Sequence, residues 1–487
     1  MNLGALFAQT PSLWYKAETY NTVARTWEYK GITVSDATKK NSVDLVHKVQ
    51  NFNPILRFKE SEKNCLHKED IGSHAFLSER ENTVLIVQNL KNNGVSFQFG
   101  AKSGHRLGTQ FASGTNNTIR FDFPNDQAGK INNFFPGKGQ MCMWELVAST
   151  NKNTFYVNGG HKTAKTCTSK FTVQSGDDLR IGRTTFSPVS ANNDTYYSDL
   201  DLAEIIIFNT CITDEERTVW ESYLGIKYSL VMNGGNYIYT SSDNSEIWGA
   251  DTNFKTNIFG IGKDTGTELN QRISAPQDKS IIVSTENKFD NNNNSVTQTL
   301  SDRQYLMIAD NGKSGADKVW KIQNTGAGKV FLKIEGGASR YLWIDDDADS
   351  SNGIIEIIKL NSEGTCECTF PNGISYMKLS DDGAFIKTWT NKDDFCVGEN
   401  IIVNVDVYCY DSSFGFDVYA KISNINPSGW ITYKYPNDKH YKGELPFDAK
   451  DYENLLFRVF VGKDNFMIEK ELYLNIHPLI HTMNISK

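Results

Sequence analysis

The sequence has few cysteines, no cluster of basic residues and no long apolar segment. Eight cysteines in 487 residues, with no CxxC pair, are too sparse for a scaffold held together by disulfides. A formal net charge of -8 without a Lys/Arg-rich block offers no basic field to a polyanion, so we expect no nucleic-acid partner. No apolar run approaches the length of a membrane span, so we expect no transmembrane helix.

Aromatic residues and polar turn residues are abundant instead. The 21 Tyr and 28 Phe, together with tracts of Asn, Thr, Ser and Gly, favour strands and turns over helix bundles. At about 150 residues per domain, a chain of this length predicts roughly two to four domains. We therefore predict a modular, mostly β protein.

The most structured segment of the sequence is 199–230. Residues 200–208 form an apolar, β-branched run that is typical of a strand buried on both faces. Thr213 and Glu216 have the spacing of a capping box, and apolar residues recur at helical spacing over 219–228. This segment predicts one strand followed by one capped helix.

Short apolar segments separated by polar loops precede this strand and helix. The Asn-Gly pair at 158–159 favours a tight hairpin turn. So many short strands predict a β-sandwich. The segments are 12–17, 53–58, 82–88, 95–100, 118–123, 141–147, 154–160, 169–173 and 178–182.

In this order, the segments resemble a laminin-G-like, concanavalin A-like jelly roll. The phrases that carry the resemblance best are Phe155-Tyr-Val-Asn-Gly159 and the run 202–209 with Thr213-Asp-Glu-Glu216. The continuation at 221–228, ESYLGIKY, is similar to a subgroup in large surface proteins of Bacteroidetes-type bacteria. In that subgroup the phrase links the lectin-like domain to a second β domain.

The resemblance and the changes in composition predict four parts of the chain. Residues 1–9 read as a remnant of a signal peptide, with the mature protein starting near Gln9 or Thr10, although an ordinary disordered start is the alternative. The jelly roll is expected at 10–230 and the second β domain at 231–385. Strand patterns over 386–487 predict an immunoglobulin-like β-sandwich.

Two cysteine pairs could carry chemistry. Cys366 and Cys368 lie on one face of a predicted strand, either as part of a metal site or as two unlinked thiols. Cys396 and Cys409 are the best candidates for a disulfide.

Jelly rolls of this type include glycosidases, which need two carboxyl groups across the scissile bond. The best candidates are Asp199, Asp201 and Glu204, but Glu204 falls at the expected change of register of its strand. The Glu-x-Asp-x-x-Glu pattern of laminarinase-like relatives is not matched, and the resemblance gives Glu204 a structural role. No Ser/His/Asp or Cys/His arrangement can be assembled, so we expect no catalysis.

Calcium is the one cofactor that the sequence suggests. Asp345, Asp347 and Asp349 alternate, and Glu356 stands twelfth, as in a calcium loop. Ser350 replaces the glycine of such a loop, and a solvated acidic loop is the alternative.

Candidate ligand contacts are the adjacent His105 and Arg106, whose donors suit sugar hydroxyls or acids, and the aromatic pair Trp14 and Tyr15, which could stack on a sugar ring. The alternatives are ordinary surface residues for the first pair and core residues for the second. Glycines in 260–266 do not fit a phosphate-binding loop.

The sequence thus predicts a secreted or cell-surface adhesin or carbohydrate-binding protein. Its expected partner is a glycan or a surface protein. The alternatives are a polysaccharide-degrading glycoside hydrolase, or its accessory module, and a structural spacer of a surface assembly.

Overall fold

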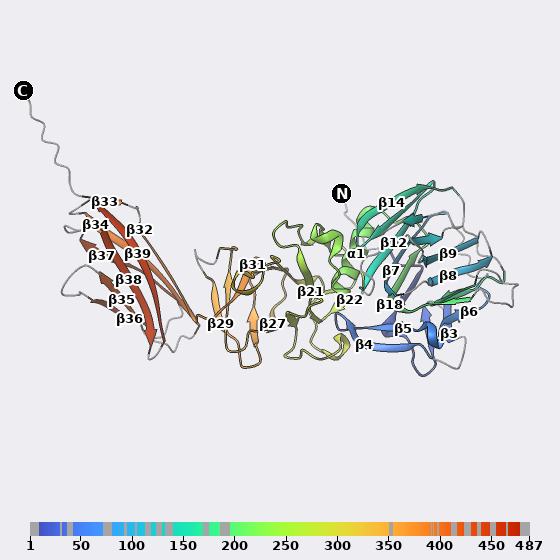
Figure 1. Ribbon diagram of the computed structural model, residues 1–487, viewed down its shortest axis with the longest axis horizontal. Helices are drawn as coiled ribbons and strands as arrows, with labels where there is room; N and C mark the ends of the chain where they lie inside the picture. The colour runs from blue at the N-terminus through green and yellow to red at the C-terminus, as the bar shows by residue number, and fades with distance from the viewer. Residues whose placement is uncertain are drawn as a thin grey trace, which may run out of the picture. The chain divides into compact units, whose positions relative to one another are not determined.

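The structure is a computed structural model, and the chain splits into two compact units (Figure 1). The first unit comprises residues 1–312 and 323–332, and the second comprises 313–322 and 333–487. The described residues are 9–29, 32–36, 42–71, 80–91, 95–102, 105–112, 118–122, 129–131, 140–168, 175–185, 195–349, 354–390, 392, 394–396, 399–410, 416–422, 430–435, 440–448, 454–463 and 466–477. Among these residues, no helix has the length and apolar character needed to cross a membrane.

The first unit begins with a sandwich of two antiparallel sheets (Figure 1). One sheet has the order β14-β13-β12-β7-β18-β5-β4, with β1 paired to β18. Its strands are β1 (Leu13–Lys16), β4 (Asp44–Gln50), β5 (Asn53–Phe58), β7 (Asn82–Leu90), β12 (Cys142–Ala148), β13 (Lys152–Val157), β14 (Gly160–Thr166) and β18 (Leu200–Phe208).

The other sheet has the order β11-β10-β9-β8-β15-β6-β3-β2. Its strands are β2 (Thr26–Tyr29), β3 (Ile32–Asp36), β6 (Leu66–Lys68), β8 (Val95–Lys102), β9 (His105–Ala112), β10 (Thr118–Asp122), β11 (Gly129–Ile131) and β15 (Leu179–Ile181). A separate pair is formed by β16 (Arg183–Thr185) and β17 (Thr195–Tyr197), and 3-10 turns lie at Ala17–Thr19 and Glu60–Glu62. One apolar core fills the space between the sheets.

The predicted mostly β jelly-roll sandwich is therefore confirmed. The expected strand 169–173 and the expected remnant 1–9, apart from Gln9, lie outside the described residues.

Strand β18 is buried on both faces, as its apolar run predicts. Leu202 and Ile205 both belong to the core between the sheets, although strict alternation would put them on opposite faces. The register of β18 against β7 shifts between Leu202 and Glu204, so a bulge inserts one residue and turns Glu204 to the outer face. The predicted change of register at Glu204 is confirmed.

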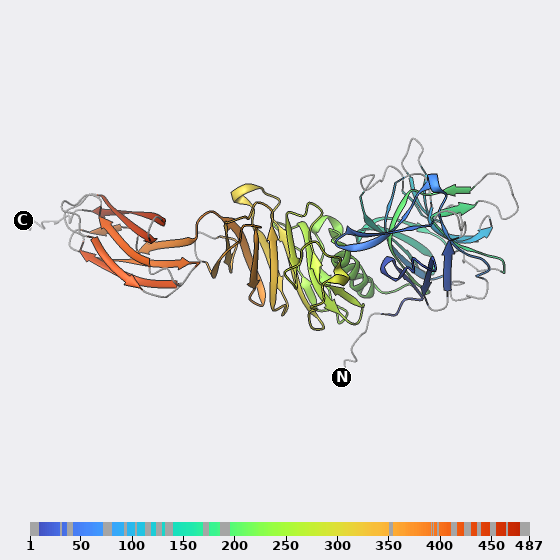
Figure 2. The ribbon, with the colours of Figure 1, turned by 90° about the horizontal axis from the view of Figure 1, so that it is seen from below.

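Helix α1 (Asp214–Tyr228) covers this outer face. The side chain of Thr213 accepts a hydrogen bond from the Glu216 backbone and the Glu216 side chain accepts one from the Thr213 backbone, so the predicted capping box is confirmed. Every residue from Val219 to Tyr228 is buried, not just the one apolar stripe that the sequence predicts. The reason is that α1 also packs against β19, β21 and β22. The green part of the ribbon that follows the helix lies beside it in both views (Figure 1, Figure 2).

The rest of the first unit continues directly from α1. Its elements are a 3-10 turn at Met232–Gly235, β19 (Tyr239–Thr240), β20 (Glu246–Trp248), β21 (Thr256–Asp264), β22 (Leu269–Gln271), β23 (Ile273–Ser274), β24 (Ile281–Ser284), a 3-10 turn at Asn293–Ser295 and β25 (Gln304–Asp310). Phe52, from the β4–β5 turn of the sandwich, lies in an apolar cluster with Ile273 and Val296. The jelly roll and the strands that follow it therefore share packed side chains across residue 230.

The second unit is also built from strands. After a 3-10 turn at Gly315–Asp317 come β26 (Trp320–Asn324), β27 (Lys329–Ile334), β28 (Tyr341–Asp345), β29 (Glu356–Lys359), β30 (Thr365–Thr369) and β31 (Gly373–Ser380); β26 and β27 each span a boundary between the units. The final strands are β32 (Ala384–Thr390), β33 (Asp394–Cys396), β34 (Asn400–Cys409), β35 (Phe416–Ile422), β36 (Trp430–Tyr435), β37 (His440–Asp448), β38 (Asn454–Lys463) and β39 (Phe466–His477).

These final strands form a three-stranded sheet, β32-β34-β37, and a five-stranded sheet, β33-β39-β38-β35-β36. The pairing of β33 with β39 is parallel, whereas β34 pairs antiparallel with both of its neighbours. The boundary expected at residue 385 falls inside β32. The immunoglobulin-like assignment of 386–487 and the division into domains stay predictions.

Candidate functional site

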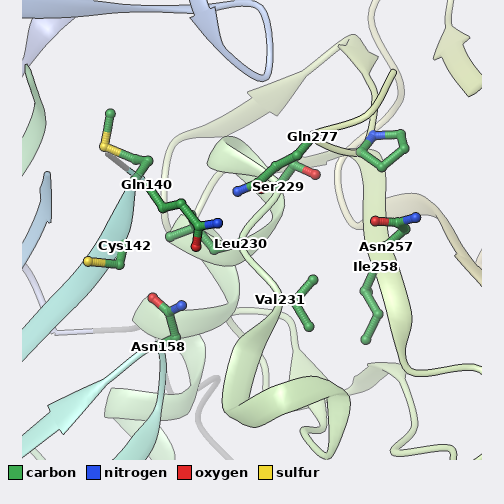
Figure 3. A pocket seen from close by; sticks show the side chains of 11 residues that line it. Gln140, Cys142, Asn158, Ser229, Leu230, Val231, Asn257, Ile258 and Gln277 are labelled. Carbon is green, nitrogen blue, oxygen red and sulfur yellow. The ribbon is translucent and has the colours of Figure 1, made fainter. Parts of the chain in front are cut away.

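A pocket of about 200 Å³ in the first unit is lined by residues from five separate segments (Figure 3). Its polar lining consists of Gln140, Cys142, Asn158, Ser229, Asn257 and Gln277, and its apolar lining of Met141, Leu230, Val231, Ile258 and Pro276. Pockets that enclose drug-sized ligands measure roughly 300–1,000 Å³, so this one suits a ligand about the size of one ring.

The pocket lining has no formal charge, because none of these residues is Asp, Glu, Lys, Arg or His. The thiol of Cys142 does not add one, since burial raises its pKa to about 12 although Trp144 donates to its Sγ over 3.1 Å. An ion would lose its hydration in such a pocket without gaining a partner of opposite charge. The lining therefore favours a neutral ligand.

Three polar residues of the pocket have left-handed backbone conformations. Asn158 has φ 46°, Ser229 φ 51° and Asn257 φ 54°. Only a few per cent of residues other than glycine have positive φ, and such residues gather at functional sites more often than elsewhere. Each of the three has a different local cause.

Asn158 forms the hairpin turn between β13 and β14 with Gly159, as the sequence predicts. The backbone N–H of Met143 donates to Asn158 Oδ1 over 2.7 Å, and Asn233 N–H donates to the Asn158 carbonyl over 2.7 Å. Because an N–H must face an oxygen, the first bond fixes the orientation of the amide. Asn158 Nδ2 is left as the donor on the side of the pocket (Figure 3).

Asn257 lies in β21 where its register against β25 is interrupted between Thr256 and Phe259. Its Nδ2 donates to Asp310 Oδ2 over 2.9 Å and to Asp278 Oδ2 over 3.3 Å. A carboxylate only accepts hydrogen bonds, so these contacts fix the amide with its nitrogen away from the pocket. Asn257 Oδ1 faces the pocket as an acceptor (Figure 3).

Ser229 is the residue that ends α1. Its backbone N–H donates to the Gly225 and Ile226 carbonyls, and the residue lines the pocket. The residue is only 4% exposed, yet its Oγ has no hydrogen-bond partner within the part of the chain that the structure describes. A buried hydroxyl without a partner costs free energy, and Ser229 is the lining residue that has such a group.

The aromatic pair predicted to contact a sugar is in the protein interior. Tyr15 is fully buried in the sandwich core and donates to the Ile32 carbonyl over 3.0 Å. Trp14 is 5% exposed and packs edge-on against Trp220 and Tyr223 of α1. Neither ring is available to stack on a ligand, because the two faces of β1 are covered by the core and by the helix.

The other predicted ligand contacts, His105 and Arg106, are the first two residues of β9. Lys102 is the register partner of His105 on β8. Their side chains lie outside what the structure describes.

The predicted calcium ligands are not gathered into one site. Asp345 ends β28, where its Oδ1 accepts from the Asp346 N–H over 2.8 Å, and Asp347 Oδ1 accepts from the Asp349 N–H over 2.7 Å. Glu356 is the register partner of Ile344, so its side chain lies on the face of the sheet opposite to that of Asp345. Over the described ranges no group of three or more His, Cys, Asp or Glu could hold a metal ion, so the predicted ligand set is wrong for these residues.

Asp345 instead lines a small pocket of the second unit with Trp343 and Lys378. The residue is 3% exposed, and its Oδ2 has no partner among the described atoms. Burial raises the pKa of Asp345 to about 6.

Glu204, the carboxylate considered for hydrolysis, is fully buried under α1. It accepts hydrogen bonds from Trp14 Nε1, Tyr223 OH (2.8 Å), Lys227 Nζ (2.8 Å) and Tyr228 OH (2.7 Å). Burial alone would raise the pKa of Glu204, but the charges of Lys227 and Lys16 and the hydrogen bonds from Lys227 and Trp14 together outweigh it and hold the pKa below its ordinary value. The Glu204 carboxylate is ionised and already accepts four hydrogen bonds, as expected for a structural ion pair.

The two aspartates that precede Glu204 are also engaged. Asp201 pairs with Arg57 over 2.7 Å and with Lys91 over 2.7 Å. Asp199 accepts from the Glu60 N–H over 2.8 Å.

The predicted disulfide between Cys396 and Cys409 is wrong. Both thiols are free; Cys396 lies on β33 and Cys409 on β34. Cys366 and Cys368 are free and buried on one face of β30 while Glu367 between them is exposed, which matches the alternative of two unlinked thiols.

No sequence pattern predicts the pocket itself. The sequence predicts a turn at Asn158, and Ser229 lies in the segment 199–230 without a predicted role of its own. Positive φ at Asn257 depends on a bulge in β21, which the sequence pattern does not reveal. Residues 158, 229 and 257 are far apart in the chain, so no spacing rule brings them together.

The similarities of this chain to known proteins are distant. Residues 216–374 match a family model described as "Domain of unknown function (DUF8202)". A comparison with curated proteins gave no match.

Similar solved structures include a heptameric SAP-like pentraxin from Limulus polyphemus (15% identity, 38% of this chain and 82% of that chain, TM-score 0.27). Domain 4 of the extracellular arabinanase AbnA from Geobacillus stearothermophilus, in complex with arabinotriose, has 14% identity over 42% of this chain and 95% of that chain, with a TM-score of 0.25. The botulinum neurotoxin serotype D binding domain has 9% identity over 92% of this chain and 99% of that chain, with a TM-score of 0.31. Similarity at this level carries no information about ligands.

Proposed function

We propose that this chain is a carbohydrate-binding protein that does not cleave its ligand, and that the pocket around Ser229 is its binding site. The observation that carries the proposal is the buried, unpartnered hydroxyl of Ser229 beside two asparagines in left-handed conformations. The hydrogen-bond donors and acceptors of these three side chains are neutral, and such groups suit a neutral molecule rich in hydroxyl groups. The pocket size suits one sugar ring at a time.

The rival function, glycoside hydrolysis, would need an accessible acid and a second carboxyl group. Glu204 is enclosed and occupied by four donors, and Asp201 by two cations. The pocket lining has no carboxyl group. These contacts favour binding without catalysis.

The cellular role that we propose is adhesion at the surface of a Bacteroidetes-type cell, with an extracellular location. It rests on the resemblance of 10–230 and 221–228 to the surface-protein subgroup, and on the proposal that 386–487 form an immunoglobulin-like module that extends the chain. A spacer without a ligand is the remaining alternative.

A glycan array with the full chain tests the proposal, with Ser229→Ala as the pocket variant and a reducing-sugar assay on the same sample. We expect glycan binding in the wild type, weaker binding in the variant, and no sugar release. Sugar release that is lost in Glu204→Gln would overturn the non-catalytic role. The absence of binding to any glycan would favour the spacer.

A further inference from the structure

Resting on the proposed function, we infer that the pocket recognises sugars that carry an acetamido group and discriminates against the same sugars without it. The inference depends on which hydrogen-bonding groups the pocket offers, and where its apolar side chains lie.

The pocket offers one oriented donor and one oriented acceptor. Asn158 Nδ2 is a donor because Met143 N–H occupies the oxygen of the same amide. Asn257 Oδ1 is an acceptor because Asp310 and Asp278 occupy the nitrogen. A secondary amide carries its carbonyl acceptor and its N–H donor on separate atoms, so it can meet both groups at once, whereas a hydroxyl would have to accept from Asn158 and donate to Asn257 through one oxygen atom.

The apolar side chains of the pocket complement the methyl group of the acetamido substituent. Leu230, Val231, Ile258 and Pro276 line the pocket, and of these four Val231 is only partly buried and so keeps apolar surface for a ligand. A bare hexose would leave this apolar surface against hydroxyl groups, at a cost in desolvation. The methyl group of an acetamido substituent instead buries apolar area there.

Because the pocket lining has no charged side chain, we expect it to bind charged sugar derivatives more weakly than neutral sugars. A free amino sugar carries an ammonium ion and a uronic acid carries a carboxylate, and the lining holds no side chain of opposite charge for either. The Ser229 hydroxyl, which both donates and accepts, suits a ring hydroxyl next to the acetamido group.

The test compares the binding of N-acetylglucosamine, glucose and glucosamine to the full chain by ligand-observed NMR titration. We expect N-acetylglucosamine to bind at least about tenfold more tightly than glucose, which is the effect of one or two additional hydrogen bonds. Asn158→Asp keeps the oxygen that accepts from Met143 and removes the donor. This variant should lose most of the preference and should bind glucosamine better than the wild type does.

Asn244→Asp is the matched control, because Asn244 is an exposed residue with φ 63° that does not line the pocket. It should leave the preference unchanged. If Asn158→Asp does not fold, Ser229→Ala takes its place, and it should weaken binding of all three sugars.

Equal affinity of the wild type for the three sugars would overturn the acetamido preference, and a glycan array positive for other sugars would leave the proposed function standing. A preference that survives in Asn158→Asp would also overturn the inference, because the donor would then have no part in recognition. The absence of binding to any sugar on the array would overturn both proposals.

Discussion

Lys227 Nζ lies 2.8 Å from Glu204 Oε2 in the interface between α1 and the outer face of β18. Both residues are buried, and Lys227 also donates to Glu18 over 2.7 Å. Burial lowers the pKa of Lys227, but the charges of Glu18 and Glu204 more than reverse this, and the pKa is raised. This ion pair fixes the helix whose end forms the pocket.

Replacing Glu204 by Gln should destabilise the fold by about 3 kcal/mol, because a buried lysine loses one of its two carboxylates. The control is Glu268→Gln, which removes a 65% exposed partner of Lys16 and should cost less than about 1 kcal/mol. Urea unfolding measures both. Similar decreases in the free energy of unfolding in the two variants would show that the buried ion pair contributes no more to stability than the exposed one.

The same ion pair sets the response to acid. Because the pKa of Glu204 is below its unfolded value, its contribution to stability is present above the unfolded pKa and is lost as pH falls through the folded pKa. The Glu204→Gln variant should therefore lose less stability than the wild type between neutral pH and acid. Parallel pH profiles of the two unfolding free energies would contradict this.

Glu145 should show the opposite pH dependence. It is fully buried beside Glu221 and Arg217, and burial followed by the charge of Glu221 raises its pKa well above the ordinary value. A raised carboxyl pKa means that stability falls as pH rises from the unfolded toward the folded pKa. Glu145→Gln, which can still accept from the Gly159 N–H, should be more stable than the wild type at about pH 8. Thermal melts at acidic and alkaline pH measure the difference, and a variant less stable at both would refute the prediction.

Asp345 offers a smaller test in the second unit. Its pKa is raised to about 6 by burial, so stability should fall as pH rises through this value. Asp345→Asn keeps the oxygen that accepts from the Asp346 N–H and should remove this fall. Asp381→Asn, at an 83% exposed carboxylate, should keep it. The wild-type slope persisting in Asp345→Asn would assign the titration to another group.

Ser229 and Ser222 form a matched pair for separating function from stability. Ser222 Oγ donates to the Thr218 carbonyl over 2.7 Å and accepts from the Thr240 N–H over 2.9 Å, so Ser222→Ala should cost about 1–3 kcal/mol. Ser229→Ala removes an unpartnered hydroxyl and should be neutral or stabilising without ligand. Equal destabilisation would mean that Ser229 has a partner in solution, and denaturant unfolding of both variants decides this.

The sequence predicted the elements whose cause is local. The β-branched run of β18, the capping box of Thr213 and Glu216 and the Asn158–Gly159 turn all lie where the pattern puts them. Each depends on the conformational preferences of a few adjacent residues. The strand that carries Trp14 and Tyr15 was also predicted, but not that both rings would be covered, because alternation assigns two faces without telling what packs on each.

The chain alone therefore determined a β-sandwich closed by one capped helix, since periodicity and turn chemistry act over a few residues. Only the tertiary structure decided that residues 219–228 of α1 are all buried, that Glu204 is an ion-pair partner of Lys227, and that Asn158, Ser229 and Asn257 meet in one pocket. These relationships join residues that are up to about a hundred positions apart. Their geometry follows from the packing of whole strands against the helix, which no local pattern encodes.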